Sequence, residues 1–267
     1  MIRRYWAFFM ILLFAASTVL AYQTSQNLKL AARGIESLSI DCGAGFLKVI
    51  GEKNRSTIQV SAAIRAQHIS PARAKRVLTR DLELKLHRQG NQAVLVSHIS
   101  SHRGYNIQIN LTVHVPERLH LTIDDGSGEM VVQNIDGTVV INDGSGGIDL
   151  RDIGGSVQIE DGSGELTLDG AGANVHITDG SGEILVSHVA GDVTIDDNSG
   201  ELRVTGVTGN VRIEDGSGDI NIRDVDGNVN IVNDGSGDLN VSGVKGTIIK
   251  GQVRIDQQKD THGAYVF

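Results

Sequence analysis

The sequence predicts an all-β protein whose main part is a single-chain parallel β-solenoid, or β-helix, with 18-residue coils of two nonapeptides. The first observation is a repeated tetrad, Asp-Gly-Ser-Gly, in which Asn198 replaces the first Gly of one copy. Five successive spacings between tetrads are 18 residues and the last is 19. A fixed period this short is typical of stacked-coil proteins, in which each repeat contacts only its neighbours. The copies begin at Asp125, Asp143, Asp161, Asp179, Asp197, Asp215 and Asp234.

The second observation is an alternation of apolar residues around a Gly that recurs in nearly every nonapeptide. Met130 and Val132 follow Gly128 at the second and fourth positions, as Val139 and Ile141 follow Gly137. Such alternation is typical of short strands with one buried face. Every second nonapeptide adds one more apolar residue, so that seven coils have 35 inward positions, of which only Lys250 is not apolar. One coil cannot bury its own face, and stability must therefore come from stacking.

The N-terminal segment has the pattern of a targeting sequence. Arg3 and Arg4 precede an apolar run from Tyr5 to Leu20, and Ala21 supplies a small residue for cleavage. We therefore expect residues 1–21 to be a signal peptide, with an uncleaved anchor as the alternative. Contact with a membrane is expected only if the segment stays uncleaved. Residues 22–35 are interpreted as a linker.

Residues 36–120 are predicted to form an N-terminal β cap and the first irregular coils. Cys42 stands in the Asp position of a degenerate tetrad, so the solenoid is expected to start there. Ser70-Pro71 followed by residues 72–80 predicts one short helix, with Ser70 as its cap. The regular solenoid is assigned to residues 121–256 and a C-terminal tail to residues 257–267. The extra residue near Val232 is expected to form a bulge.

Charge divides the chain. Residues 1–120 carry 16 Lys+Arg and 6 Asp+Glu, a net of +10, whereas residues 121–267 carry 8 and 26, a net of −18. The acidic repeats would repel a polyanion, so nucleic acid is not an expected partner. Cys42 is the only cysteine, which excludes an internal disulfide.

The repeats place carboxyl groups in two columns, interpreted as running along one edge. One column is the tetrad series, Asp125 to Asp234. The other follows it: Glu129, Glu165, Glu183, Glu201, Asp219 and Asp238. Each tetrad Asp is expected to accept a hydrogen bond from the backbone N–H two residues on. The alternative is that the tetrad Asp series binds a row of Ca²⁺ ions, and no other cofactor is expected.

No catalytic motif accompanies the repeats, and no long loop interrupts residues 125–250. The Gly-Ser-Gly-Glu units, the pair Val115-Pro116 and the early Cys42-Gly43-Ala44-Gly45 coil resemble the putative-adhesin family of bacterial exported β-solenoid proteins. That resemblance implies surface attachment and carries no catalytic residues. The expected function is a non-enzymatic, adhesin-like structural or binding scaffold, exported to the periplasm or cell surface. Its expected partner is an envelope glycan or another envelope protein. The alternatives are a polysaccharide-processing β-helix enzyme and a cation-binding solenoid.

Overall fold

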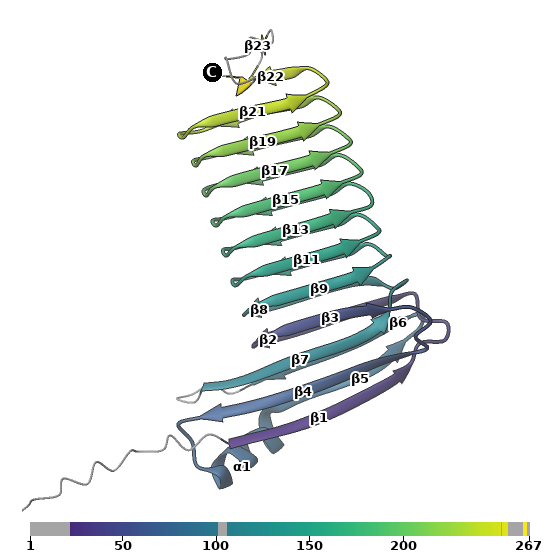
Figure 1. Ribbon diagram of the computed structural model, residues 1–267. Helices are drawn as coiled ribbons and strands as arrows, with labels where there is room; N and C mark the ends of the chain where they lie inside the picture. The colour runs from purple at the N-terminus through teal and green to yellow at the C-terminus, as the bar shows by residue number, and fades with distance from the viewer. Residues whose placement is uncertain (1–21, 101–105, 252, 256–263, 266–267) are drawn as a thin grey trace, which may run out of the picture.

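The predicted β-solenoid is confirmed by the computed structural model, which describes residues 22–100, 106–251, 253–255 and 264–265 (Figure 1). The expected signal peptide, residues 1–21, lies outside the described residues. Successive coils stack into a rod in which each coil gives one strand to each of two sheets.

The first sheet has, in spatial order, β1 (Tyr22–Ala31), β4 (Thr57–Gln67), β7 (Asn106–Pro116), β3 (Leu47–Glu52), β9 (Met130–Ile135), β11 (Ile148–Ile153), β13 (Leu166–Ala171), β15 (Ile184–Val189), β17 (Leu202–Val207), β19 (Ile220–Val225), β21 (Leu239–Val244) and β24 (Ala264–Tyr265). The second sheet has β23 (Val253–Ile255), β22 (Ile248–Lys250), β20 (Val229–Asp234), β18 (Val211–Asp215), β16 (Val193–Asp197), β14 (Val175–Asp179), β12 (Val157–Asp161), β10 (Val139–Asp143), β8 (His120–Ser127), β2 (Ser37–Ala44), β6 (Gln92–Ile99) and β5 (Leu82–Gln89).

Register follows the 18-residue period from one coil to the next. Ile141 pairs with Ile159, and Ile159 pairs with Ile177, all in parallel strands. These side chains are buried and fill the thin interior between the sheets. The extra residue near Val232 shifts the pairing of β18 with β20 between Ile213 and Glu214, which confirms the expected bulge.

The N-terminal region forms one end of the rod, but its chain order differs from its spatial order. β2 and β3 make the first coil: β2 lies between β6 and β8, and β3 lies between β7 and β9. Cys42 pairs with Asp125, so the solenoid does start at the early coil. The one helix of the described residues, α1 (Pro71–Asp81), begins at Pro71 as expected, although the Ser70 side chain makes no capping hydrogen bond.

Two of the predicted segments, the linker and the C-terminal tail, differ from the structure. Residues 22–35 are not a linker, because β1 pairs antiparallel with β4 over its whole length, from Tyr22 with Ala66 to Ala31 with Thr57. Residues 257–267 are not wholly a tail, because β24 pairs antiparallel with β21. Among the described residues, no helix combines the length and apolarity needed to cross a membrane.

Candidate functional site: a buried carboxyl column

The tetrad Asp side chains lie inside the rod, not along its edge as the sequence analysis interpreted them. Those of Asp125 to Asp215 are only 1–7% exposed. The cause is the two-residue period of the strand: in β10, Val139, Ile141 and Asp143 alternate with outward residues and share the inner face. This period was present in the sequence, so the signal that could have placed these carboxyls inside was available.

The column runs through consecutive coils in register. Asp125 pairs with Asp143, Asp143 with Asp161, and the pairing continues to Asp234. Parallel strands lie about 4.8 Å apart, so that each carboxyl has another about one rung above and below it.

The two ends of the column differ from its middle. At the N-terminal end Asp125 pairs with Cys42, which in turn pairs with buried Ser97. The Cys42 Sγ donates to Asp125 Oδ1 over 3.3 Å, and burial followed by the charge of Asp125 raises the pKa of the thiol. At the other end Lys250 Nζ lies 2.6 Å from Asp234 Oδ2. This contact gives a partner to Lys250, the one residue of the 35 predicted inward positions that is not apolar.

Some carboxyl oxygens of the column accept hydrogen bonds from the backbone of their own tetrad turn. The Ser163 N–H donates to Asp161 Oδ1 over 3.1 Å, and the same bond runs from Ser199 to Asp197. It recurs from Ser217 to Asp215 at 3.2 Å. These are the bonds expected of a tetrad turn in which an Asp side chain accepts from the backbone two residues on.

The remaining oxygens of the column have no hydrogen-bond partner. Both carboxyl oxygens of Asp143 and Asp179 are unpartnered, as is Oδ2 in Asp125, Asp161, Asp197 and Asp215. Burial raises the pKa of Asp143 to about 7 and that of Asp179 to about 6, and the neighbouring carboxyls add to both shifts.

The other members of the column shift in the same direction. Burial raises the pKa of Asp197 to about 6, and it also raises the pKa values of Asp125, Asp161 and Asp215. Burial disfavours the charged form of a carboxyl. The column is therefore a set of acids that favours the neutral form more than an exposed aspartate does.

The tetrad Asp carboxyls, the alternative Ca²⁺ ligands, lie in a row from coil to coil. Across the described part of the chain, no three His, Cys, Asp or Glu side chains are arranged to hold one. Ca²⁺ takes six to eight oxygen ligands, whereas here the carboxyls follow each other along a line.

The second acidic column lies on the surface. Arg203 bridges two of its members, since the guanidinium contacts Glu201 and lies 3.8 Å from Glu183 Oε1. Water screens such exposed pairs. A further ladder at another corner was missed by the sequence analysis: the backbone N–H of Asp192 donates to Asn174 Oδ1 over 3.0 Å, and that of Asn210 donates to Asp192 Oδ1 over 2.7 Å.

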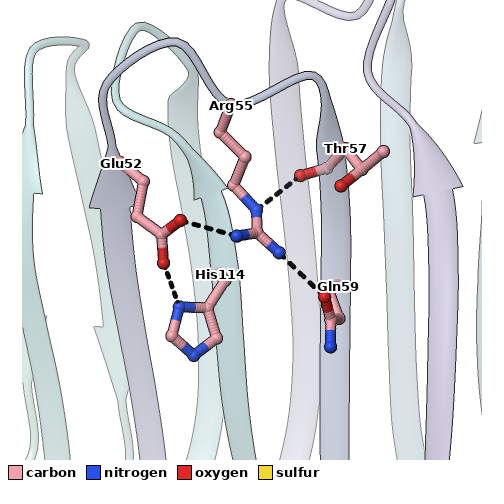
Figure 2. A network of polar contacts seen from close by, with 5 residues as sticks. All are labelled: Glu52, Arg55, Thr57, Gln59 and His114. Carbon is pink, nitrogen blue, oxygen red and sulfur yellow. Dashed lines mark hydrogen bonds and ion pairs between the residues drawn. The ribbon is translucent and has the colours of Figure 1, made fainter.

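A separate polar network joins strands at the N-terminal end of the rod (Figure 2). Arg55 donates to Glu52 Oε2 over 2.6 Å, to the Thr57 carbonyl over 2.8 Å and to Gln59 Oε1 over 3.0 Å. His114 Nδ1 of β7 lies 2.5 Å from Glu52 Oε1. The hydrogen bond from Arg55, followed by that from His114, lowers the pKa of Glu52. The network ties the turn between β3 and β4 to β7.

Solved structures similar to this chain come from several bacteria. A putative cell adhesion protein from Clostridium sporogenes ATCC 15579 is 12% identical, with 75% of this chain and 99% of that chain covered and a TM-score of 0.39. A putative adhesin from Bacteroides fragilis NCTC 9343 is 13% identical, with 86% and 97% covered and a TM-score of 0.37. A putative lipid binding protein from Parabacteroides distasonis ATCC 8503 is 13% identical, with 85% and 96% covered and a TM-score of 0.37.

A search of curated protein sequences found no match. A family model described as Toastrack DUF4097 matches residues 35–262, which include every regular coil of the rod. This match confirms the resemblance to a putative-adhesin family of unknown function. The chain belongs to the Toastrack DUF4097 family.

Proposed function

We propose that this protein is an exported, non-enzymatic scaffold of the bacterial cell envelope that attaches to an envelope glycan through an outer face of its rod. The observation that carries the proposal is the uniformity of the coils. From β9 to β22 the connections alternate between three residues, as in 136–138, and four residues, as in 144–147. Catalytic clefts on β-structures are usually built by long loops, and the described coils between residues 125 and 250 have none.

The outer faces instead present mostly polar side chains at a regular spacing of one rung. On the first sheet Thr167, Leu185 and Arg203 follow one another in register, one rung apart. Gln158, His176 and Thr194 do the same on the second sheet. Groups repeated about every 4.8 Å along a rod suit a partner that is itself an extended polymer.

Charge favours a glycan without many anionic groups. The repeats carry a net charge of −18, which would repel a polyanion. Export is proposed from Arg3, Arg4 and the apolar run that follows them.

The test has two parts. Cells that express the full-length chain with a C-terminal tag are fractionated, and the N-terminus of the recovered protein is sequenced. The proposal expects the protein outside the cytoplasm with its N-terminus near Tyr22. Full-length protein in the soluble cytosol would contradict export.

The recovered protein is then incubated with purified envelope polysaccharide and, separately, with envelope protein extract. Two variants serve as matched controls for each other: Thr167, Leu185 and Arg203 changed to Ala, and Gln158, His176 and Thr194 changed to Ala. The proposal expects the polysaccharide to be retained and its chain length unchanged, with retention lost in one variant only. Shortening of the polysaccharide would show that the protein is an enzyme. Binding of an envelope protein without binding of the polysaccharide would show that the partner is a protein and not a glycan.

A further inference from the structure

The six carboxyls from Asp125 to Asp215 are more deeply buried than any solvated turn requires. Asp179 is 1% exposed and Asp143 is 3% exposed, and all four of their oxygens lack a hydrogen-bond partner. Burial at this depth disfavours an ionised carboxylate unless a cation or enough donors pair with it. The carboxyls of neighbouring coils can pair with one another only if protons are bound between them.

The charged groups around the column do not stabilise ionised carboxylates, because they are carboxyls themselves. Asp143 is acted on by Asp125 and Asp161, and Asp179 by Asp161 and Asp197. Further along, Asp215 and Asp196 act on Asp197, and Asp234 acts on Asp215.

The N-terminal end of the column has further carboxyls beside it, whereas the other end has a cation. Asp124 acts on Asp125, and Asp41 acts on the thiol of Cys42. Among the described ion pairs, the one cation that contacts the column is Lys250, at Asp234. From Asp125 to Asp215 every charged neighbour named here is another carboxyl, so ionisation of all six would place like charges about one rung apart.

We propose that these six carboxyls hold protons in the folded rod and form a one-way chain of hydrogen bonds, which makes the coil stack a pH-sensitive device. The thiol of Cys42 donates to Asp125 at one end. Each protonated carboxyl then donates its O–H to the carboxyl of the next coil. Asp215 donates to Asp234, whose Oδ2 lies 2.6 Å from Lys250 Nζ.

The chain of bonds accounts for the unpartnered oxygens. A protonated carboxyl has one O–H donor and keeps acceptor capacity on both oxygens. One oxygen can therefore accept from the tetrad backbone, as in Asp161, while the other takes part in the bond between coils. The in-register pairing of Asp143 with Asp161 supplies the alignment that such a bond needs.

The direction of the pH dependence follows from the proton balance. The folded rod holds protons that the unfolded chain has released, because burial raises the pKa values of these carboxyls above the usual 3.8. Stability from the column is fully present below about pH 3.8 and is lost as the pH rises through about 6 to 7. The column thus stabilises the rod most in acid and least above neutrality.

The test compares the melting temperature of the exported protein at pH 5 and pH 8, with a metal chelator present throughout. In one variant Asp143, Asp179 and Asp197 are changed to Asn, which resembles a protonated carboxyl in shape and can also donate from coil to coil. In the matched control Glu129, Glu165 and Glu183, all in the surface column, are changed to Gln. Imidazole groups also bind protons in this range, so the comparison between variants carries the test.

We expect the wild type and the control to melt several degrees lower at pH 8 than at pH 5, and the Asn variant to lose most of that difference. A wild-type melting temperature that is the same at both pH values would overturn the proposal, as would an undiminished fall in the Asn variant. Unfolding by the chelator at pH 5 would show that metal ions, not protons, occupy the column.

A second measurement does not depend on the variants folding. Carboxyl carbons of aspartate, labelled with ¹³C in the wild type, are followed by NMR as the pH is raised from 4 to 9. At least three buried aspartates should change between pH 5 and 8. If every aspartate carboxyl has changed by pH 5, the column is ionised in the folded rod and the proposal fails.

Discussion

Replacement of Gly164 by Ala should destabilise the rod strongly, because the close stacking of tetrads leaves no room for a side chain. A Cβ added at Gly164 would lie 1.6 Å from the carbonyl oxygen of Gly146 in the preceding coil. Real Cβ atoms essentially never come closer than 3.0 Å, so the two coils would have to separate locally by 3.0 − 1.6 = 1.4 Å. The backbone φ of +148° adds strain for any residue with a side chain.

The cost can be assembled from the bonds that this separation breaks. The Gly146 N–H donates to the Ser163 carbonyl over 2.9 Å, and the Gly162 N–H donates to the Asp143 carbonyl over 3.0 Å. Each lost backbone bond costs about 1 kcal/mol, and more if the groups stay buried and unpartnered. An unfavourable φ adds about 1–2 kcal/mol. We expect a loss of about 3–6 kcal/mol, a large part of the roughly 5–15 kcal/mol that holds most domains folded.

Urea unfolding followed by far-ultraviolet circular dichroism measures this loss, and two other glycines separate its causes. Gly90→Ala has a positive φ of +65° but nothing within 4 Å of the new Cβ, so it should lose only the strain part, about 1–2 kcal/mol. Gly43→Ala brings the Cβ to an ordinary 3.6 Å from His98 Nδ1 and should be nearly neutral. If Gly164→Ala is no worse than Gly90→Ala, close stacking of the tetrads is not what the glycines provide.

Two further substitutions test the interior and the end of the column. Leu168→Asp puts an unpaired charge at a position with 0% exposure and should cost several kcal/mol in the same urea assay; a loss below about 1 kcal/mol would mean that Leu168 does not face a closed core. Lys250→Met removes the ammonium beside Asp234, where the side chains are 38% and 23% exposed, so solvent screening limits the loss to about 1 kcal/mol or less. That small loss should shrink further in concentrated sodium chloride, and a salt-independent loss would show that packing, not charge, holds this end.

The regular coils could be predicted from the sequence because the period carries both strand and register. Ile141, Ile159 and Ile177 are 18 residues apart and pair directly. Even the irregularities were visible: Cys42 takes the Asp position, and the extra residue near Val232 forms the bulge.

The inward direction of the Asp column was missed for a physical reason. Val139, Ile141 and Asp143 follow the two-residue period of a strand, but charged residues are seldom fully buried. That general tendency favoured the surface, and the strand geometry overrode it. Only the neighbouring coils show that Asp143 has another carboxyl on each side.

The N-terminal errors have another origin, which is non-local pairing. In β1 only Leu28 and Leu30 mark an apolar face after a polar start, so the segment looks like a linker. Its partner β4 begins at Thr57, and nothing near Tyr22 in the sequence indicates that pairing. The position of β2 between β6 and β8 is likewise set by strands far along the chain.

Deletion of one coil tests most directly the claim that an 18-residue unit with an inward Asp builds this rod. Removal of residues 161–178 takes out β13, the last residue of β12 and all but the last residue of β14. Asp179 then takes the position of Asp161, in register with Asp143. Removal of residues 161–169 instead places first-sheet strands against second-sheet strands. We expect the first deletion to keep the circular dichroism and cooperative melting of the parent, and the second to lose much of its stability. Equal unfolding of both, or a stable protein from the nine-residue deletion, would contradict the coil assignment.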